Sequence, residues 1–199
     1  GRNLRLIMVD SANGYDFGIS PFSKRLRPEY RAAAKLADDA GVEPWLVTHQ
    51  PPTAITTTRF NPGNIPNWQN WVADDQAAAS YGLLGKYTAM VSGHLHLSQV
   101  VKVKGLPPQF VFGGGGTKLD PDSGYTVPKY GPLSTSKGTP LVPGLKPYPR
   151  DAYRWIEVQH AFGVARPNPS QGAWDVQFVQ PNGQSLSTCT VRAGTPDCG

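Results

Sequence analysis

Two short apolar runs that each stop at a histidine constrain the fold of this chain more than any other feature. Residues 44–48 (PWLVT) lead directly into His49, and residues 88–92 (TAMVS) lead into the segment GHLH at 93–96. The chain has four histidines in 199 residues, so three of the four follow these two runs. Both runs have the length and composition of buried strands. Because side chains that follow such strands gather at one edge of a sheet, we expect the three histidines to lie close together.

Other periodic segments place these two strands in an α/β fold. Residues 4–9 (LRLIMV) predict a third buried strand, and residues 27–41 (RPEYRAAAKLADDAG) predict a helix. Pro28 suits the first turn of that helix, and Gly41 suits its C-terminal cap. A second helix is expected over residues 68–79. The alternation of strands and helices in the first half predicts layers of helix and sheet.

The second half of the chain predicts strands without helices. Residues 113–150 are rich in Gly and Pro and show no periodicity, which we interpret as a long surface loop inside a single domain of residues 1–199. Residues 151–199 predict terminal strands, with Asn182-Gly183 as a two-residue hairpin turn. The further strands expected in the whole chain are 99–103, 109–112, 153–160, 173–180 and 184–192.

The charge and hydropathy of the chain exclude some classes of partner. The net charge is +5, but the basic residues are spread along the whole sequence, which does not favour a nucleic-acid surface. The one local basic cluster, residues 24–31, leads into the first predicted helix and is interpreted as a solvated helix end. No segment approaches the roughly 18 consecutive apolar residues that a membrane span needs.

The only two cysteines, Cys189 and Cys198, would close a short loop near the C-terminus. Two cysteines with no spare thiol predict a disulfide, and hence an extracytoplasmic location that is periplasmic or secreted. The alternative of two unbonded thiols stays open at this point. The chain is also compatible with being the mature part of a longer protein.

The histidines suit metal binding by their chemistry and spacing. His94 and His96 provide a preordered pair of neutral imidazoles, which are good ligands for Zn, Fe and Mn. Gly93 is expected to remove a side chain that would crowd the approach of the two rings. The His-x-His pattern alone is a weak signal. His160 ends a predicted strand without a companion and is interpreted as a structural residue.

Taken together, WLVTHQPP (45–52) and VSGHLHLSQ (91–99) resemble the fourth and fifth signature blocks of calcineurin-like metallophosphoesterases. The segment QFVFGGGGT (109–117) is similar to the strand and glycine run that follow in that family. The resemblance implies a partial four-layer αββα sandwich with a β-rich C-terminal part. It also implies a hydrolase of phosphomonoesters or phosphodiesters, with two divalent or trivalent metal ions (Fe, Zn or Mn). By their positions in the motifs, His49 and His94 would bind one ion and His96 the other.

The resemblance is incomplete at the N-terminal side. The first three blocks of the family, Asp-x-His, Gly-Asp and Gly-Asn-His-Asp/Glu, have no counterpart here, and Asp10 is not followed by a histidine two residues later. Three neutral imidazoles without a carboxylate cannot balance two such cations, and the histidine expected to protonate the leaving group is also lacking. We therefore expect the C-terminal portion of a metallophosphoesterase that needs an N-terminal polypeptide, from the same precursor or a companion chain. The alternative is a non-catalytic fragment or interaction module with structural histidines.

Contacts to a phosphoester substrate are less well defined. The loops at 53–66 and 113–150 are expected to flank the site, and Arg59, Asn61 and Lys118 are candidates for contact with a phosphate. For each of these three the favoured interpretation is an ordinary solvated loop residue. The pattern assigns no catalytic acid and no firm substrate-binding residue.

Overall fold

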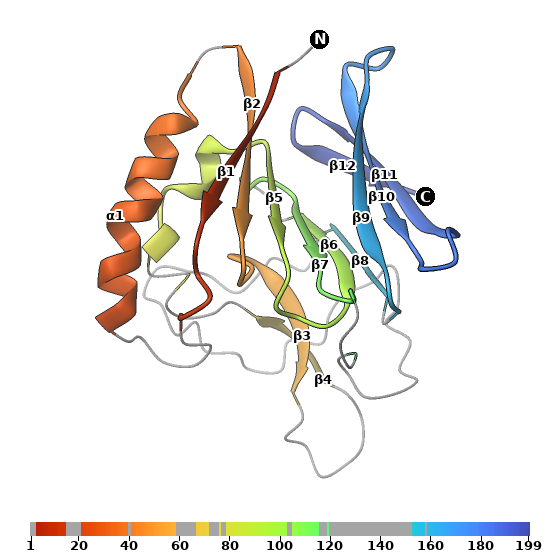
Figure 1. Cartoon of the computed structure of the whole chain (residues 1–199), viewed down its shortest axis with the longest axis horizontal. Helices are drawn as coiled ribbons and strands as arrows, with labels where there is room; N and C mark the ends of the chain where they lie inside the picture. Colours follow the sequence, from red (N-terminus) through yellow and green to blue (C-terminus); the bar gives the residue numbers. More distant parts are fainter. Residues whose placement is uncertain are drawn as a thin grey trace.

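The computed structural model describes residues 3–14, 21–39, 41–58, 67–71, 76, 79–102, 105–115, 119, 153–157 and 159–199. This part of the chain is a mixed α/β structure with three sheets (Figure 1). Its elements in chain order are β1 (Asn3–Val9), α1 (Pro21–Leu36), β2 (Val42–Thr48), β3 (Ala54–Thr58), β4 (Asn67–Trp71), the 3₁₀ turn η1 (Leu84–Lys86), β5 (Ala89–Ser92), β6 (Ser98–Lys102), β7 (Gln109–Phe112), β8 (Tyr153–Glu157), β9 (Phe162–Asn168), β10 (Ala173–Val179), β11 (Ser185–Arg192) and β12 (Thr195–Cys198).

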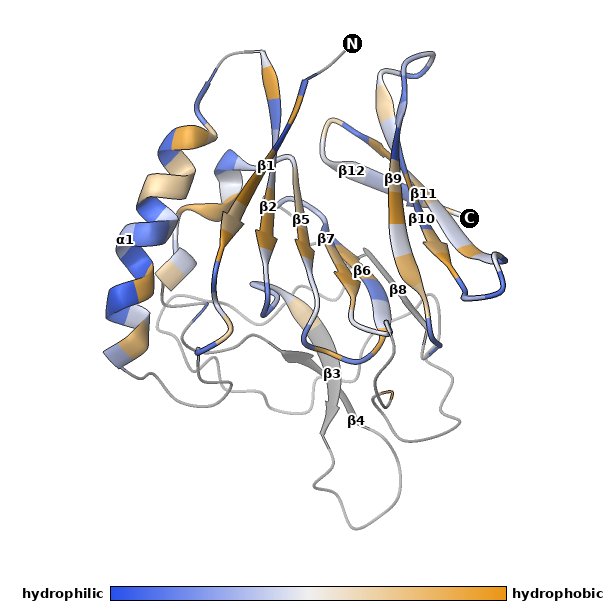
Figure 2. Ribbon diagram, viewed as in Figure 1, coloured by the Kyte–Doolittle hydropathy of each residue, from blue (hydrophilic) through white to orange (hydrophobic). Residues whose placement is uncertain are grey.

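The largest sheet has six strands in the order β1-β2-β5-β7-β6-β8. Strands β1, β2, β5 and β7 run parallel, whereas β6 pairs antiparallel with both β7 and β8. The hydrophobic colouring of Figure 2 is concentrated on the central strands, because strands of a parallel sheet are covered on both faces. All the strands expected from the sequence are confirmed, within a few residues at their ends.

Helix α1 covers one face of the six-stranded sheet. Its residues Leu26 and Tyr30 are fully buried and share an apolar cluster with Leu46 of β2 and Met90 of β5. Leu26, Tyr30 and Ala33 recur at a spacing of three or four residues, so they lie on one side of the helix. Burial of each large apolar side chain contributes about 1.5–3 kcal/mol, which is enough for this stripe to hold the helix on the sheet.

The second sheet is antiparallel, in the order β12-β11-β10-β9, and covers the opposite face of the first (Figure 1). Val176 and Phe178 of β10 pack into a cluster with Trp45 of β2 and Phe110 of β7. The rings of Trp45 and Phe110 are stacked with centroids 6.4 Å apart, and those of Phe110 and Phe178 are 6.5 Å apart. The described residues thus form three layers, helix, sheet and sheet. This confirms the prediction of an α/β arrangement followed by a β-rich C-terminal part.

The predicted bounds of the first helix were wrong at both ends. Helix α1 begins at Pro21 and ends at Leu36, so Pro28 lies inside it instead of in its first turn. The apolar stripe extends back to Leu26, and its burial outweighs the helix hydrogen bond that a proline cannot donate. Gly41 does have a left-handed φ of +83°, but it stands directly before β2 instead of capping the helix.

The second predicted helix was wrong over its first turn, because residues 67–71 form β4. This strand pairs antiparallel with β3, whose sequence AITTT is rich in β-branched residues that favour strands. Gln76 and Ala79, later in the predicted range, are helical.

The turn between β10 and β11 was also predicted too short. Gln180 N donates to Gln184 O, so three residues separate this pair, and the third, Gly183, has a φ of +84°. This is the three-residue hairpin loop with a left-handed glycine. Three strands were not predicted from the sequence: β9 and β12, which lack a continuous apolar run, and β3, which lies inside the predicted loop at 53–66.

The predicted disulfide is confirmed. Cys189 and Cys198 are bonded, and they lie directly opposite each other on β11 and β12. Both are buried in the cluster between the two sheets. None of the described helices combines the length and hydropathy that crossing a membrane requires.

Candidate metal centre

The carboxyl ends of the parallel strands meet at one edge of the six-stranded sheet. In the register of the ladder, Val9 of β1 pairs with Thr48 of β2, and Thr48 pairs with Ser92 of β5. The next residue of β2 is His49, and Gly93 N donates to His49 O at 3.1 Å, which continues the ladder past the strand ends. His49 and the loop that begins at Gly93 therefore lie next to each other at the carboxyl edge of the sheet.

A buried polar network supports this edge from below. Thr48 Oγ1 lies 2.7 Å from Ser92 Oγ and donates to Gln50 O at 2.7 Å. Gln109 Nε2, at the start of the short strand β7, donates to Ser92 Oγ at 3.2 Å, so the network ties the carboxyl ends of β2 and β5 to the neighbouring strand. Sequence reasoning missed this network, although a signal was present: both apolar runs end in a hydroxyl residue directly before the histidine motif. Buried hydroxyls that are hydrogen-bonded hold a loop in one arrangement.

Two consecutive γ-turns shape the histidine loop. Leu95 N donates to Gly93 O and Leu97 N donates to Leu95 O, each at 2.8 Å, so His94 and His96 are the central residues of the two turns. His94 has a φ of +64°, which is the rare and strained form for a residue with a side chain. Leu95 and Leu97 are buried and anchor the loop. Such strain costs about 1–3 kcal/mol and is found most often at functional sites.

The structure brings His49 and His94 into direct contact. His94 Nδ1 lies 3.1 Å from His49 Nε2, and the two rings meet edge to face with centroids 5.0 Å apart. One nitrogen must donate and the other accept, so a single proton lies between the two rings. This contact confirms the expectation that these two histidines, 45 positions apart in the chain, meet in space.

The spacing of the two nitrogens fits a shared cation. Two nitrogen ligands at about 2.05 Å from one zinc ion are about 3.3 Å apart in tetrahedral geometry and about 2.9 Å apart at a right angle. The observed 3.1 Å lies between these values. His49 Nε2 and His94 Nδ1 could therefore hold one metal ion, in place of the proton that they now share.

The described residues do not fit the second ion of a two-metal centre. His96 is part of the same loop and half-buried, but the described part of the chain contains no group of three or more His, Cys, Asp or Glu residues that could hold a metal. Asp10 follows β1 at the same edge, where its Oδ1 accepts from Ala12 N at 3.1 Å in a local turn. The carboxylates that would balance a second cation are not found in this part of the chain.

Two glycines have roles that differ from the sequence prediction. A Cβ on Gly93 would meet no atom within 4 Å beyond its two chain neighbours, so the expected relief of crowding between His96 and the rest of the site does not arise there. The close approach occurs instead at Gly113, after β7, where a Cβ would lie 1.6 Å from Leu95 O and 3.3 Å from His96 N. Gly113 N also donates to Leu97 O at 3.1 Å. The backbone at Gly113 thus packs against the histidine loop.

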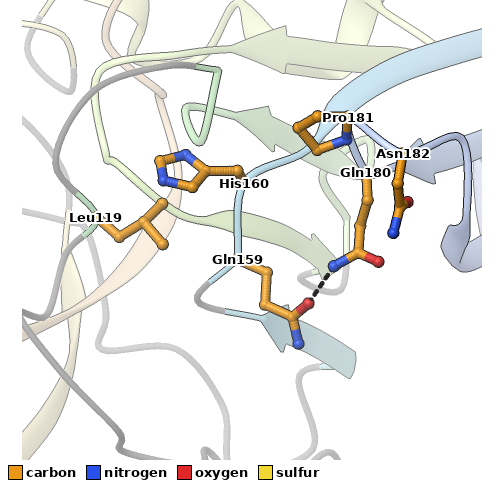
Figure 3. Close-up of a pocket in the computed structure, with 6 residues that line it drawn as sticks. All are labelled: Leu119, Gln159, His160, Gln180, Pro181 and Asn182. Carbon is orange, nitrogen blue, oxygen red and sulfur yellow. Dashed lines mark hydrogen bonds between the residues drawn. The ribbon is translucent and has the colours of Figure 1, made fainter.

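Of the other candidates, Arg59, Asn61 and Lys118 lie outside the described residues. His160 is exposed, its Nδ1 lies 2.9 Å from Gly114 O, and it is one of the residues that line a separate surface pocket (Figure 3). Searches of known proteins add no identification: no family model matches the chain, and no curated protein matches it either.

Proposed function

We propose that this chain is the C-terminal portion of a metal-dependent phosphoester hydrolase similar to the calcineurin-like metallophosphoesterases. The observation that carries the proposal is the 3.1 Å approach of His49 Nε2 and His94 Nδ1 at the carboxyl edge of a parallel sheet. The strained turn at His94 supports it, because a non-glycine residue with positive φ needs a compensating role. The resemblance of WLVTHQPP and VSGHLHLSQ to two signature blocks of that family also supports the proposal.

In this proposal, His49 and His94 hold one cation, and the hydrogen-bonded pair Thr48 and Ser92 keeps the two strand ends in register. The metal ions, Fe, Zn or Mn, would supply an activated water and neutralise charge on the phosphoryl oxygens. His96, two residues further along the loop, would serve the second ion once carboxylate ligands are present. The net charge of +5 favours the approach of an anionic phosphoester.

The missing ligands would come from an N-terminal polypeptide of the same precursor or from a companion chain. Strand β1 is at the edge of the six-stranded sheet, and its residues Leu6 and Met8 are 58% and 78% exposed. An edge strand with exposed apolar side chains is a surface on which further chain can pack. The three observed layers would then belong to the four-layer αββα sandwich, and the disulfide would place the enzyme outside the cytoplasm.

The second candidate function is a non-catalytic interaction module. The contact between His49 Nε2 and His94 Nδ1 also favours this candidate, because two imidazoles can form this hydrogen bond without a metal ion. It also accounts for the lack of a carboxylate beside them in the described part of the chain.

Metal titration separates these two candidates. We would titrate Zn²⁺ and Mn²⁺ into the purified chain by calorimetry and repeat the titration with His49→Ala, His94→Ala and, as a matched control, the exposed His160→Ala. The hydrolase proposal predicts at least a tenfold loss of metal affinity in the first two variants, an unchanged affinity in the control and retained circular dichroism in all three. Equal affinity in all four proteins would refute the metal site and leave the interaction module.

The need for an N-terminal portion has its own test. Native mass spectrometry under non-reducing conditions should detect a second polypeptide and two metal ions with the chain in the active material. The purified chain alone should hydrolyse neither 4-nitrophenyl phosphate nor bis(4-nitrophenyl) phosphate in millimolar Mn²⁺. Phosphodiesterase activity from the chain alone would show that no further polypeptide is required.

A further inference from the structure

Strand β1 exposes an apolar strip at the end of the six-stranded sheet. The strand order places β1 at this end, with β2 as its neighbour (Figure 1). Leu4, Leu6 and Met8 alternate with Ile7 and Val9, which pack against α1, so the first three point to the face that the second sheet covers. Leu4 packs against the cluster between the sheets, whereas Leu6 and Met8 are 58% and 78% exposed. Successive exposed apolar side chains on one face of a strand are typical of an interaction surface.

Two other edge strands show how this protein protects an edge. Strand β9 contains Arg166 and Pro167 side by side, and β12 contains Pro196 and Asp197. A proline lacks the N–H that a further strand would bind, and pairing would remove an edge charge from water, so both features oppose strand addition. Strand β1 contains no proline, and its one charged residue, Arg5, lies on the α1 side.

The charge of Arg5 is matched within the chain. Its Nη1 donates to Leu36 O at 2.8 Å and also pairs with Asp39, so the guanidinium is held against the end of α1. This side chain therefore does not protect the open face of β1 in the way that an edge lysine would.

The sequence of β1 is complementary to itself in the antiparallel direction. A two-fold axis at Leu6, perpendicular to the sheet, places Leu6 opposite Leu6 of a second copy and Leu4 opposite Met8. All pairs on the open face are then apolar, a combination that stabilises cross-strand contacts. An axis at Arg5 would instead set two arginines opposite each other, which is unfavourable. Because self-complementary surfaces form two-fold dimers, a second copy of the chain is the occupant that fits this strand.

We propose that two copies of this chain associate by antiparallel pairing of their β1 strands, centred on Leu6. The seven residues of β1 give a paired segment about 23 Å long, and the two six-stranded sheets become one. Each copy covers the exposed Leu6 and Met8 of the other, and the pairing satisfies backbone groups along both edges. One strand from each copy is a small interface, so we expect a transient dimer with affinity in the micromolar range.

The dimer does not depend on the proposed hydrolase, but it would affect how that enzyme assembles. The N-terminal polypeptide of the hydrolase and the second copy would compete for the same strand. If the hydrolase function holds, on which this step alone rests, dimerisation keeps the chain from its N-terminal polypeptide.

Sedimentation velocity in a metal chelator tests the proposal. Over micromolar concentrations the purified chain should change from monomer to dimer. Leu6→Lys and Met8→Lys should weaken this association at least tenfold, because an edge lysine opposes strand pairing. The matched control, Phe162→Lys, replaces a 49% exposed apolar side chain on the protected edge strand β9 and should leave association unchanged. Circular dichroism should show that all three variants are folded, since each changes an exposed side chain.

Cysteine crosslinking tests the register of the pairing. Cys189 and Cys198 are bonded to each other, so Leu6→Cys introduces the one free thiol of the chain. In the proposed register the two Cβ atoms at Leu6 are about 4.5–5.5 Å apart, which is close enough for a disulfide to form. The two copies of Met8 are offset by about four residues, or about 14 Å along the strand. Leu6→Cys should therefore crosslink into a dimer at least fivefold faster than Met8→Cys under mild oxidation.

The results that would overturn the proposal are distinct from those that concern the hydrolase. A chain that stays monomeric, a dimer that both lysine variants leave intact, or larger aggregates without a dimer would refute the pairing of β1. Equal crosslinking of Leu6→Cys and Met8→Cys would refute its register. A dimer together with a failed metal titration would keep the pairing and remove the hydrolase, and a monomer that binds metal would do the opposite.

Discussion

Replacement of Gly113 by alanine should damage the histidine loop, although Gly113 is not part of either histidine motif. The added Cβ would lie 1.6 Å from Leu95 O, whereas a carbon–oxygen contact needs about 3.3 Å. The backbone must therefore open by about 1.7 Å at this point. Because Leu95 stands between His94 and His96, this movement displaces both imidazoles.

The size of the effect follows from the contacts that are lost. Overpacking of a close contact costs about 1–3 kcal/mol, and the hydrogen bond from Gly113 N to Leu97 O contributes about 0.5–1.5 kcal/mol more. We expect a loss of about 3 kcal/mol in the free energy of unfolding. For a domain of this size, that loss lowers the melting temperature by about 6–12 °C. Metal affinity should fall at least tenfold, since ligands displaced by more than an ångström no longer share one ion.

Gly93→Ala is the matched control, because it places the same methyl group at the start of the same loop. Beyond its two chain neighbours no atom lies within 4 Å of the added Cβ, and Gly93 does not have a positive φ. Its stability should be unchanged or higher by a few tenths of a kcal/mol, because alanine restricts the unfolded chain. The assay is thermal unfolding followed by circular dichroism, together with the zinc titration. Equal melting temperatures for the two variants would show that the contact between Gly113 and the loop is not formed in solution.

Two further predictions concern stability. Burial, with a contribution from the charge of Asp38, raises the pKa of Tyr87 from 10.0 to about 12. Because the folded state holds this proton more tightly than the unfolded chain, its contribution to stability is complete below pH 10 and is lost as the pH rises to about 12. The loss is about 2.7 kcal/mol, and Tyr87→Phe should reduce the decline measured in urea titrations by this amount. An equal decline in the variant would contradict the burial of this hydroxyl. Reduction of the Cys189–Cys198 bond, which joins residues 9 positions apart, should lower the free energy of unfolding by about 2.5–3 kcal/mol. An unchanged urea midpoint in dithiothreitol would refute this estimate.

Short-range sequence patterns were sufficient to predict much of the fold and the location of the candidate metal site. The apolar runs at 44–48 and 88–92 predicted buried strands, because a parallel strand is covered on both faces and must be apolar along its length. The motifs after these runs predicted that His49 and His94 would meet, since parallel strands end at a common edge. The cysteine count predicted the disulfide. These inferences depend only on side-chain chemistry and on short repeats.

Other features depend on contacts between distant segments, which no local pattern records. Residues 67–71 became a strand because β3 pairs with them, and helix α1 extended back to Pro21 because the sheet buries Leu26. The steric demand for glycine lies at Gly113 and not at Gly93, because it arises where the β7 end meets Leu95. His160 lies beside its hydrogen-bond partner, Gly114 O, only because the fold brings together residues that are 46 positions apart in the chain. Sequence pattern therefore indicates which groups can do chemistry, whereas packing sets which of them meet and in what geometry.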